Sequence, residues 1–161
     1  MKDMVDIEVI IDEKYVDPKV AIHTKRKTEQ IDNIIYAIEN VSGSDFPAIP
    51  AFMGERIELL SQRDIFRVYT QGRKVVVQTE KESFTVRKTL SGLEEDLNPK
   101  RFLRISQSEI INLYKIKCFD ITLAGTIGIT FDNGIQSWAS RSRVKAVKDM
   151  IRELEEERRQ L

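Results

Sequence analysis

Side chains that commonly carry catalytic or metal chemistry are sparse in this sequence. It contains one histidine, His23, and one cysteine, Cys118, so neither a histidine-based catalytic arrangement nor a Cys/His metal-ligand pattern is present. Cys118 has no partner for an internal disulfide, and its strand-like context predicts a packed thiol. For His23, in a short apolar run, we expect a packed or surface role.

The carboxylates and glycines offer no clearer catalytic arrangement. Glu80 and Glu82 fit a polar turn and residues 94–96 fit a solvated helix face, so no acid/base pair stands out. No glycine follows a strand and opens a helix in a GxGxxG or GxxxxGK pattern, so no phosphate-binding loop is predicted. We therefore expect a protein without enzymatic activity, metal or cofactor.

The net charge of zero conceals an uneven distribution along the chain. Residues 1–62 hold 7 basic and 12 acidic residues, a net of −5, whereas residues 63–145 hold 15 and 9, a net of +6. Such a basic surplus is compatible with phosphate contacts without establishing them, since many surface domains are mildly basic.

Length and composition indicate an ordinary globular protein. A chain of 161 residues, 41% hydrophobic and 32% charged, can form one domain or two small ones. The N-terminus, MKDMVDIEV, lacks a basic stretch followed by an apolar one, and no apolar run approaches the roughly 20 residues of a membrane span. We therefore expect a cytoplasmic protein.

Residues 101–113, RFLRISQSEIINL, form the segment around which the other elements are arranged. One side of its first half carries Phe102, Arg104 and Ser106, and the other carries Leu103 and Ile105. This alternation is the period of a half-buried strand. Small hydroxyl residues then break the strand at 106–108, because they bond to their own backbone, and a second apolar run ends at Asn112. Periodicity alone predicts two strands with a turn between them.

The same segment resembles the signature of the LytTR DNA-binding domain of bacterial transcription regulators. The residues that carry the resemblance are Phe102-Leu103-Arg104, Ser108, Ile110-Ile111-Asn112, Lys115 and Ile116. From about Gly54 to Ile151, GERIELL, DIFRVYTQGRKVVVQT, SFTVRKTLSGLEEDL and DNGIQSWASRSRVKAV also follow in the family's order and spacing. Many members carry a histidine and a basic residue where Ser106 and Gln107 stand here, and an aromatic where Glu109 stands. The SxSEIIN variant is similar to a subgroup of short, response-regulator-like proteins without a receiver domain.

From Gly54 onward we expect a mainly β domain. Short runs rich in β-branched residues predict a meander of strands at 57–60, 65–70, 73–79 and 84–87. A short helix over 89–97, with a capping box at 91–94, carries Leu90, Leu93 and Leu97 on one face. Strands at 119–123, 126–131 and 135–139 follow, and Asn133-Gly134 is a strong hairpin signal. The resemblance implies a LytTR-like elongated β-sheet domain with one short internal helix and a C-terminal helix, which reaches DNA through loops.

Residues 1–53 predict a small α+β N-terminal unit before the LytTR-like domain of 54–161. Apolar runs at 7–11 and 20–23 predict strands. The spacing of Ile31, Ile34, Ile35 and Ile38 predicts a helix, with Thr24 or Thr28 as its cap and Ser42-Gly43 at its end. A further strand at 46–52 contains Pro47 and Pro50, which favours a sheet edge.

The C-terminal helix is expected to begin after Ser140 or Ser142. Its apolar seam comprises Val144, Val147, Ile151 and Leu154, with Leu161 in the same register. Spacings of three and four permit coiled-coil pairing, although packing on the helix's own domain is commoner.

The resemblance implies three DNA-contacting segments, which are the turn at 71–74, the end of the central segment and the loop at 140–143. The residues that it assigns to DNA binding are Arg73, Lys74, Asn112, Ser140, Arg141, Ser142 and Arg143. Arginine can pair with phosphate or guanine, lysine with phosphate, and asparagine with adenine. Exposed arginines are also ordinary solvated residues, and an asparagine at a strand end is often a turn former. Because a carboxylate repels phosphate, we expect Glu109 to face away or to bond backbone amides.

The resemblance implies a sequence-specific DNA-binding transcription regulator of bacterial type. We expect it to bind double-stranded DNA as a homodimer on repeated sites, without a small-molecule substrate, and the resemblance adds a membrane-protein regulatory partner. The alternative is a small β-rich protein-interaction or sensor module without nucleic-acid binding. DNA affinity that falls as salt rises would distinguish the two, because phosphate contacts release counterions.

Overall fold

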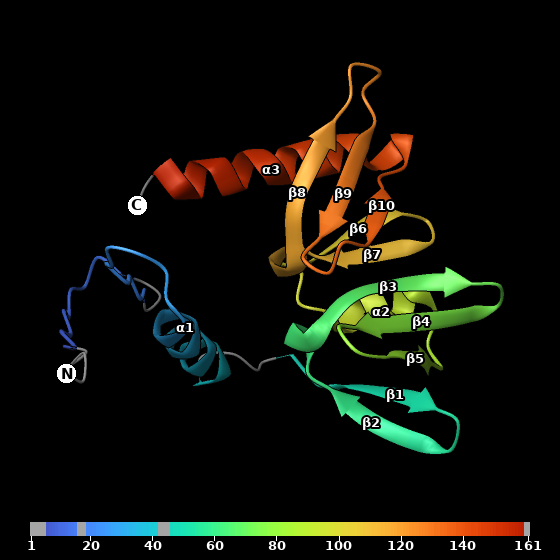
Figure 1. The fold of residues 1–161 in the computed structure, drawn as a ribbon, viewed down its shortest axis with the longest axis horizontal. Helices are drawn as coiled ribbons and strands as arrows, with labels where there is room; N and C mark the ends of the chain where they lie inside the picture. Colours follow the sequence, from blue (N-terminus) through green and yellow to red (C-terminus); the bar gives the residue numbers. More distant parts are fainter. Residues whose placement is uncertain (1–5, 16–18, 42–45, 160–161) are drawn as a thin grey trace. The chain divides into compact units, whose positions relative to one another are not determined.

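The computed structural model describes residues 6–15, 19–41 and 46–159. The chain divides into two units, Met1–Ser42 and Gly43–Leu161. Within the described residues, the second unit contains one seven-stranded and one three-stranded sheet (Figure 1). This mainly β architecture, with one short internal helix and a C-terminal helix, is the predicted fold class. None of the helices within those ranges is long and apolar enough to span a membrane.

In the first unit the predicted helix is present, whereas the strands predicted at 7–11 and 20–23 are not. Helix α1 (Glu29–Val41) begins after Thr28, whose Oγ1 accepts a hydrogen bond from the backbone N of Ile31 at 3.4 Å. Residues 7–11 and 20–23 form no strand, and their apolar side chains are largely exposed. The α+β character predicted for this unit is therefore not confirmed, since an apolar run becomes a strand only beside a partner strand. The predicted helix end at Ser42-Gly43 lies outside the described residues.

The large sheet is antiparallel, in the order β2-β1-β5-β4-β3-β7-β6. Its strands are β1 (Ile49–Met53), β2 (Arg56–Leu60), β3 (Ile65–Gln71), β4 (Lys74–Thr79), β5 (Ser83–Val86), β6 (Phe102–Ser106) and β7 (Glu109–Asn112). The predicted meander is confirmed for β3, β4 and β5, which are neighbours in the sheet. Strand β2, predicted to be its first strand, lies instead at the sheet edge beside β1.

Strand β1 lies between β2 and β5, so its predicted edge position is wrong. Its register with β5 is confined to Phe52 and Thr85, which leaves no ladder bond for Pro50 to donate on that side. Because β1 belongs to the sheet, the compact units divide earlier than the predicted boundary between 53 and 54. Independent folding of each unit stays a prediction.

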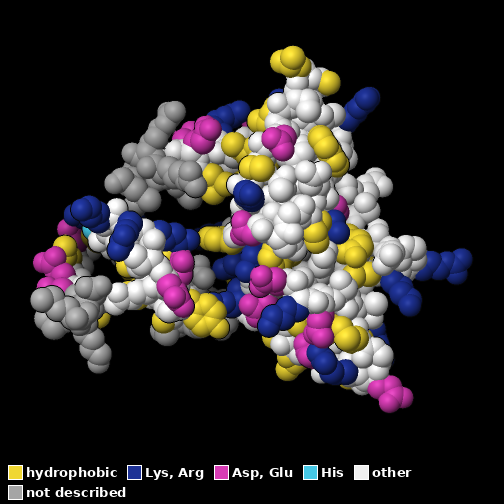
Figure 2. Space-filling view, in the orientation of Figure 1, with side chains coloured by type: hydrophobic (Ala, Val, Ile, Leu, Met, Phe, Trp, Pro, Cys, Tyr) yellow, Lys and Arg dark blue, Asp and Glu magenta, His cyan; other side chains and the backbone are white. Residues whose placement is uncertain are grey.

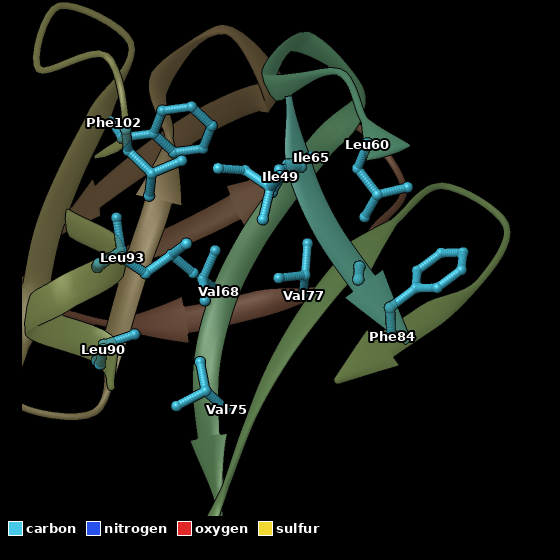
Figure 3. Close-up of a cluster of buried hydrophobic side chains, with 13 residues drawn as sticks. Ile49, Leu60, Ile65, Val68, Val75, Val77, Phe84, Leu90, Leu93 and Phe102 are labelled. Carbon is cyan, nitrogen blue, oxygen red and sulfur yellow. The ribbon is translucent and has the colours of Figure 1, made fainter. Parts of the chain in front are cut away.

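Helix α2 (Leu90–Asp96) covers one face of the large sheet (Figure 3). As predicted, Leu90, Leu93 and Leu97 are buried, and they pack in a cluster with residues of β1 to β7. The cap lies earlier than predicted. The side chain of Thr89 accepts a hydrogen bond from the backbone N of Gly92 at 3.1 Å.

A second sheet covers the other face near β3, β6 and β7. It consists of β8 (Ile116–Ile121), β9 (Ile127–Phe131) and β10 (Gln136–Trp138), in the order β10-β9-β8. Ile105 and Ile111 of the large sheet pack with residues of β9 and with Val147. The central segment is therefore covered on both faces, not half-buried as predicted. Cys118, on edge strand β8, is exposed, so the packed-thiol prediction is wrong.

The C-terminal helix α3 (Val144–Arg159) follows a short 3-10 turn, η3 (Arg141–Arg143). Val147 is buried, and Val144 and Ile151 pack against the same cluster. Leu154 is 40% exposed, so the seam extends beyond the part of α3 that packs on this domain. Leu161 lies outside the described residues.

Candidate nucleic-acid interface

Three turns of the second unit are connected by backbone hydrogen bonds. They are the β3–β4 turn at 71–74, the β6–β7 turn at 106–108 and the loop at 140–143. The backbone N of Thr70 donates to the carbonyl of Ser108 at 2.9 Å, and the backbone N of Ser140 donates to the carbonyl of Ile105 at 2.8 Å. The β6–β7 turn therefore lies between the other two, and the three form one surface, called the turn edge below.

The β3–β4 turn presents two predicted cations, Arg73 and Lys74. Gln71 pairs with Lys74, so this is a two-residue hairpin turn, and Gly72 has a φ of 61° that other residues rarely adopt. Both cationic residues are exposed. In the space-filling view, Lys and Arg side chains project at the right-hand margin, over this hairpin tip (Figure 2). They are accessible to a phosphate backbone.

The loop at 140–143 presents the other predicted cations. Arg141 and Ser142 are exposed, and Arg143 is half-buried. The hydroxyls of Ser140 and Ser142 lie 3.1 Å apart, and the backbone N of Arg143 donates to the carbonyl of Ser140 at 2.9 Å. The loop leads directly into α3, and the N-terminal end of a helix dipole favours anions.

Asn112 is buried, with 0% of its surface exposed, and lies away from the turn edge, at the far end of β7. Its Nδ2 donates to the carbonyl of Ile65 at 2.7 Å, and its Oδ1 accepts from the backbone N of Tyr114 at 3.0 Å, which caps the 3-10 turn η2 (Leu113–Lys115). Burial and the two hydrogen bonds occupy both ends of the amide, which argues against the predicted contact with adenine. The alternative of a turn former is correct.

The β6–β7 turn was not among the three segments for which sequence analysis predicted DNA contact. Gln107 and Ser108 are exposed there, between the two basic turns. A glutamine amide can form a bidentate contact with adenine. Two sequence signals mark this turn. It interrupts a strand with hydroxyl residues, and it holds the positions where many LytTR members carry a histidine and a basic residue.

Arg104 stabilises the β6–β7 turn by hydrogen bonds to its backbone carbonyls. Its Nε donates to the carbonyl of Ser106 at 3.0 Å, and its Nη2 donates to that of Gln107 at 2.7 Å. Its Nη1 donates to Ser91 and Glu94 of α2 at 3.0 and 2.9 Å. These bonds commit the guanidinium to the protein, so Arg104 supports the turn and is not available to phosphate.

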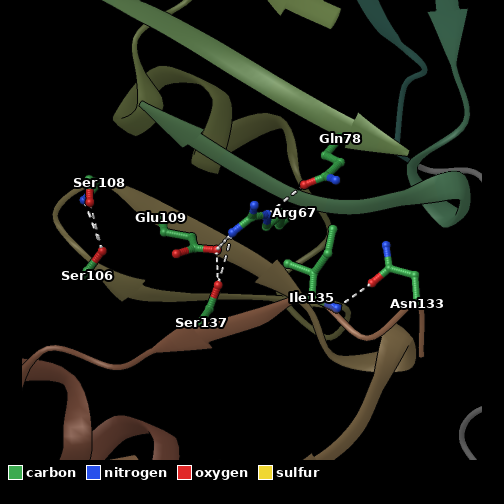
Figure 4. Close-up of polar contacts among 8 residues, drawn as sticks. All are labelled: Arg67, Gln78, Ser106, Ser108, Glu109, Asn133, Ile135 and Ser137. Carbon is green, nitrogen blue, oxygen red and sulfur yellow. Dashed lines mark hydrogen bonds and ion pairs between the residues drawn. The ribbon is translucent and has the colours of Figure 1, made fainter. Parts of the chain in front are cut away.

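Glu109 is turned into the protein. Its Oε1 accepts from Arg67 Nη1 at 3.1 Å and from Ser137 Oγ at 2.6 Å (Figure 4). Of the two expectations for Glu109, its partners match an orientation away from the surface and not hydrogen bonds to backbone amides. The neighbouring guanidinium offsets the negative charge beside the turn edge.

The chain is similar to a known protein family, to proteins of related sequence and to a solved structure. The model of the LytTr DNA-binding domain family matches residues 55–152. Proteins of Staphylococcus aureus strains MSSA476 and MW2, described as uncharacterized HTH-type transcriptional regulators, are each 24% identical over 148 residues, covering 92% of this chain and 99% of the relative. A solved LytTr DNA-binding domain from Bacillus cereus superposes with a TM-score of 0.62 at 19% identity, covering 65% of this chain and 96% of that one.

In the ranges that the structure describes, no two α-helices are consecutive, so they contain no helix-turn-helix. The matches to the staphylococcal relatives extend beyond the family-model region into the N-terminal unit, because they span 92% of the chain. Since the family model matches more than half of the residues, this chain belongs to the LytTR family of DNA-binding domains.

Proposed function

We propose that this DNA-binding transcription regulator contacts double-stranded DNA through the turn edge. One observation carries the proposal. Backbone hydrogen bonds from Thr70 to Ser108 and from Ser140 to Ile105 bring two cationic segments to either side of an exposed polar turn. Cations that flank a polar group suit a duplex, where phosphate contacts set orientation and base contacts give specificity.

The proposal assigns different tasks to the three turns. Arg73, Lys74, Arg141 and Arg143 pair with phosphates, and the arginines are also suited to guanine. The hydroxyls of Ser140 and Ser142 donate to phosphate oxygens. Gln107 takes the base-reading task that the sequence prediction gave to Asn112.

We also propose that the protein acts in the cytoplasm as a homodimer on repeated DNA sites. The seam of α3, which continues to the partly exposed Leu154, supports pairing of two copies. A regulatory membrane-protein partner rests on the family resemblance alone.

Fluorescence anisotropy across a salt series tests DNA binding through the turn edge. The full chain is titrated with a DNA site selected from random sequence and with mixed DNA, and affinity should fall as salt rises. Lys74→Ala should weaken both and reduce the salt slope by about one unit. Lys81→Ala is the matched control, because Lys81 is exposed beyond the other end of β4. A salt-independent affinity, or equal effects of the two variants, would contradict the proposal.

A further inference from the structure

Three side chains from three strands form a hydrogen-bonded triangle between the two sheets. Arg67 belongs to β3, Glu109 to β7 and Ser137 to β10. Arg67 Nη1 donates to Glu109 Oε1 and to Ser137 Oγ, each at 3.1 Å, and Ser137 Oγ donates to the same Glu109 oxygen at 2.6 Å. Figure 4 shows the three side chains converging from their separate strands.

The triangle is shielded and its guanidinium is fixed on several sides. The side chains of Arg67 and Glu109 are only 19% and 15% exposed, and Ser137 is buried. Arg67 Nε donates to Gln78 Oε1 on the neighbouring β4 at 2.7 Å. The guanidinium carbon lies 4.5 Å from the centre of the Tyr69 ring. Low solvent exposure and directed hydrogen bonds together give the triangle a defined geometry.

Each member of the triangle lies close in the chain to a different part of the turn edge. Arg67 precedes Thr70, the residue that bonds to the β6–β7 turn, by three positions. Glu109 follows that turn directly. Ser137 precedes Ser140, where the third segment begins, by three positions.

We propose that this triangle is a positioning device that fixes the three turns relative to one another for base reading. The inference rests on the proposed DNA contact through the turn edge. The apolar cluster between the sheets supplies attraction without direction, whereas hydrogen bonds fix orientation. A partly buried ion pair is in itself a weak source of stability, so directional control is the role that suits its geometry. None of its three members is assigned to DNA contact.

The variants Glu109→Ala, Glu109→Gln and Ser137→Ala of the full chain test the proposal against the selected site and mixed DNA. Glu109→Ala should lower affinity for the selected site about tenfold, because residues without ligand contact modulate binding on that scale. Its salt slope should match the wild type, since no phosphate contact is removed. Glu109→Gln keeps an oxygen that accepts both hydrogen bonds and should stay within about threefold of wild type.

Ser137→Ala keeps the test decisive if Glu109→Ala fails to fold. It removes only a hydroxyl and should lower affinity for the selected site about threefold, with affinity for mixed DNA unchanged. Circular dichroism melts show that each variant is folded at the titration temperature. Glu82→Ala is the matched control, because it removes an exposed ion pair with Arg56, in the turn before β5, and should leave both affinities unchanged.

Three outcomes would overturn the inference. Wild-type affinity in folded Glu109→Ala and Ser137→Ala would show that the triangle does not position the turns. Equal changes in Glu109→Ala and Glu109→Gln, with tighter binding and a steeper salt slope, would assign the effect to carboxylate charge. A wild-type chain without salt-dependent DNA binding would remove the proposed function as well, and this result is distinct from the first two.

Discussion

Asn112 joins three segments of the domain through a single amide. It ends β7, donates to the carbonyl of Ile65 at the start of β3, and caps η2 through Tyr114. A buried asparagine that satisfies two backbone groups contributes to stability, because a buried polar group left without a partner costs free energy. An asparagine side chain is suited to adenine, but the burial of Asn112 favours a structural role.

The first prediction follows from the two backbone groups that Asn112 satisfies. Asn112→Ala should lower the free energy of unfolding by about 3 kcal/mol, because it leaves a carbonyl and an amide unpaired. Urea denaturation measures the loss. Asn133→Ala is the control, since Asn133 is exposed and bonds only the backbone N of Ile135, and it should cost less than about 1 kcal/mol. Unchanged stability in Asn112→Ala with lost DNA specificity would restore the base-reading role.

Gln107 carries the second prediction at this scale. Gln107→Ala should cost about 1–3 kcal/mol of binding free energy on the selected DNA site and leave weak binding to mixed DNA nearly intact. Its salt slope should not change, because an uncharged amide neutralises no phosphate. Gln136→Ala, which removes another exposed glutamine from β10, should behave as wild type. A parallel loss on both DNAs in Gln107→Ala would assign this side chain to the backbone.

At the scale of elements, periodicity predicted the strands of the second unit but not their order. Runs of β-branched residues identify β3, β4 and β5, since alternation and hairpin turns are local properties. The insertion of β1 between β2 and β5 depends on distant pairing, which no local pattern specifies. The difference between local pattern and distant pairing also decides how much of the candidate site could be predicted. Turn residues such as Arg73 could be predicted, whereas the position of the β6–β7 turn depends on bonds from Thr70 and Ser140.

Helix α3 allows a test of where its apolar seam is used. Val147→Ala should cost about 1.6 kcal/mol of folding stability, because it removes two buried methyl groups, at about 0.8 kcal/mol each, from the cluster under the helix. Leu154→Ala should change monomer stability by less than about 0.5 kcal/mol, because Leu154 is partly exposed. Thermal denaturation of both variants measures these costs.

The same pair of variants separates packing from pairing. If the outer half of α3 joins two copies, Leu154→Ala should weaken self-association in sedimentation experiments, and Val147→Ala should not do so while folded. Association that is equal to wild type in Leu154→Ala would exclude the α3 seam as the pairing surface and leave the folding role of Val147 intact.

At the scale of the whole molecule, the two compact units differ in net charge. Residues 1–42 hold 6 basic and 9 acidic residues, a net of −3, and form the first unit. The basic surplus of 63–145 lies in the second unit, with the turn edge. An acidic unit on the same chain opposes association with DNA, and salt screens that repulsion. The second unit alone should therefore bind DNA at least as tightly as the full chain at low salt.

Two fragments test this division, because they differ only in residues 43–53. Fragment 43–161 keeps β1 and should fold and bind the selected DNA site with the salt dependence of the full chain. Fragment 54–161 lacks β1, including the buried Ile49 and Ala51, and leaves the facing edges of β2 and β5 unpaired. It should lose its cooperative thermal transition in circular dichroism and therefore its specific binding.

Comparing the two fragments shows whether the DNA-binding domain needs β1 in order to fold. Equal stability and affinity of the two fragments would show that β1 is dispensable, and the boundary between 53 and 54 would then describe the functional domain. A folded fragment 43–161 that fails to bind DNA, beside a full chain that binds, would show that the N-terminal unit contributes directly to DNA contact. Retained binding by 43–161 alone would assign β1 to the DNA-binding domain, because the sheet that carries the turn edge requires that strand.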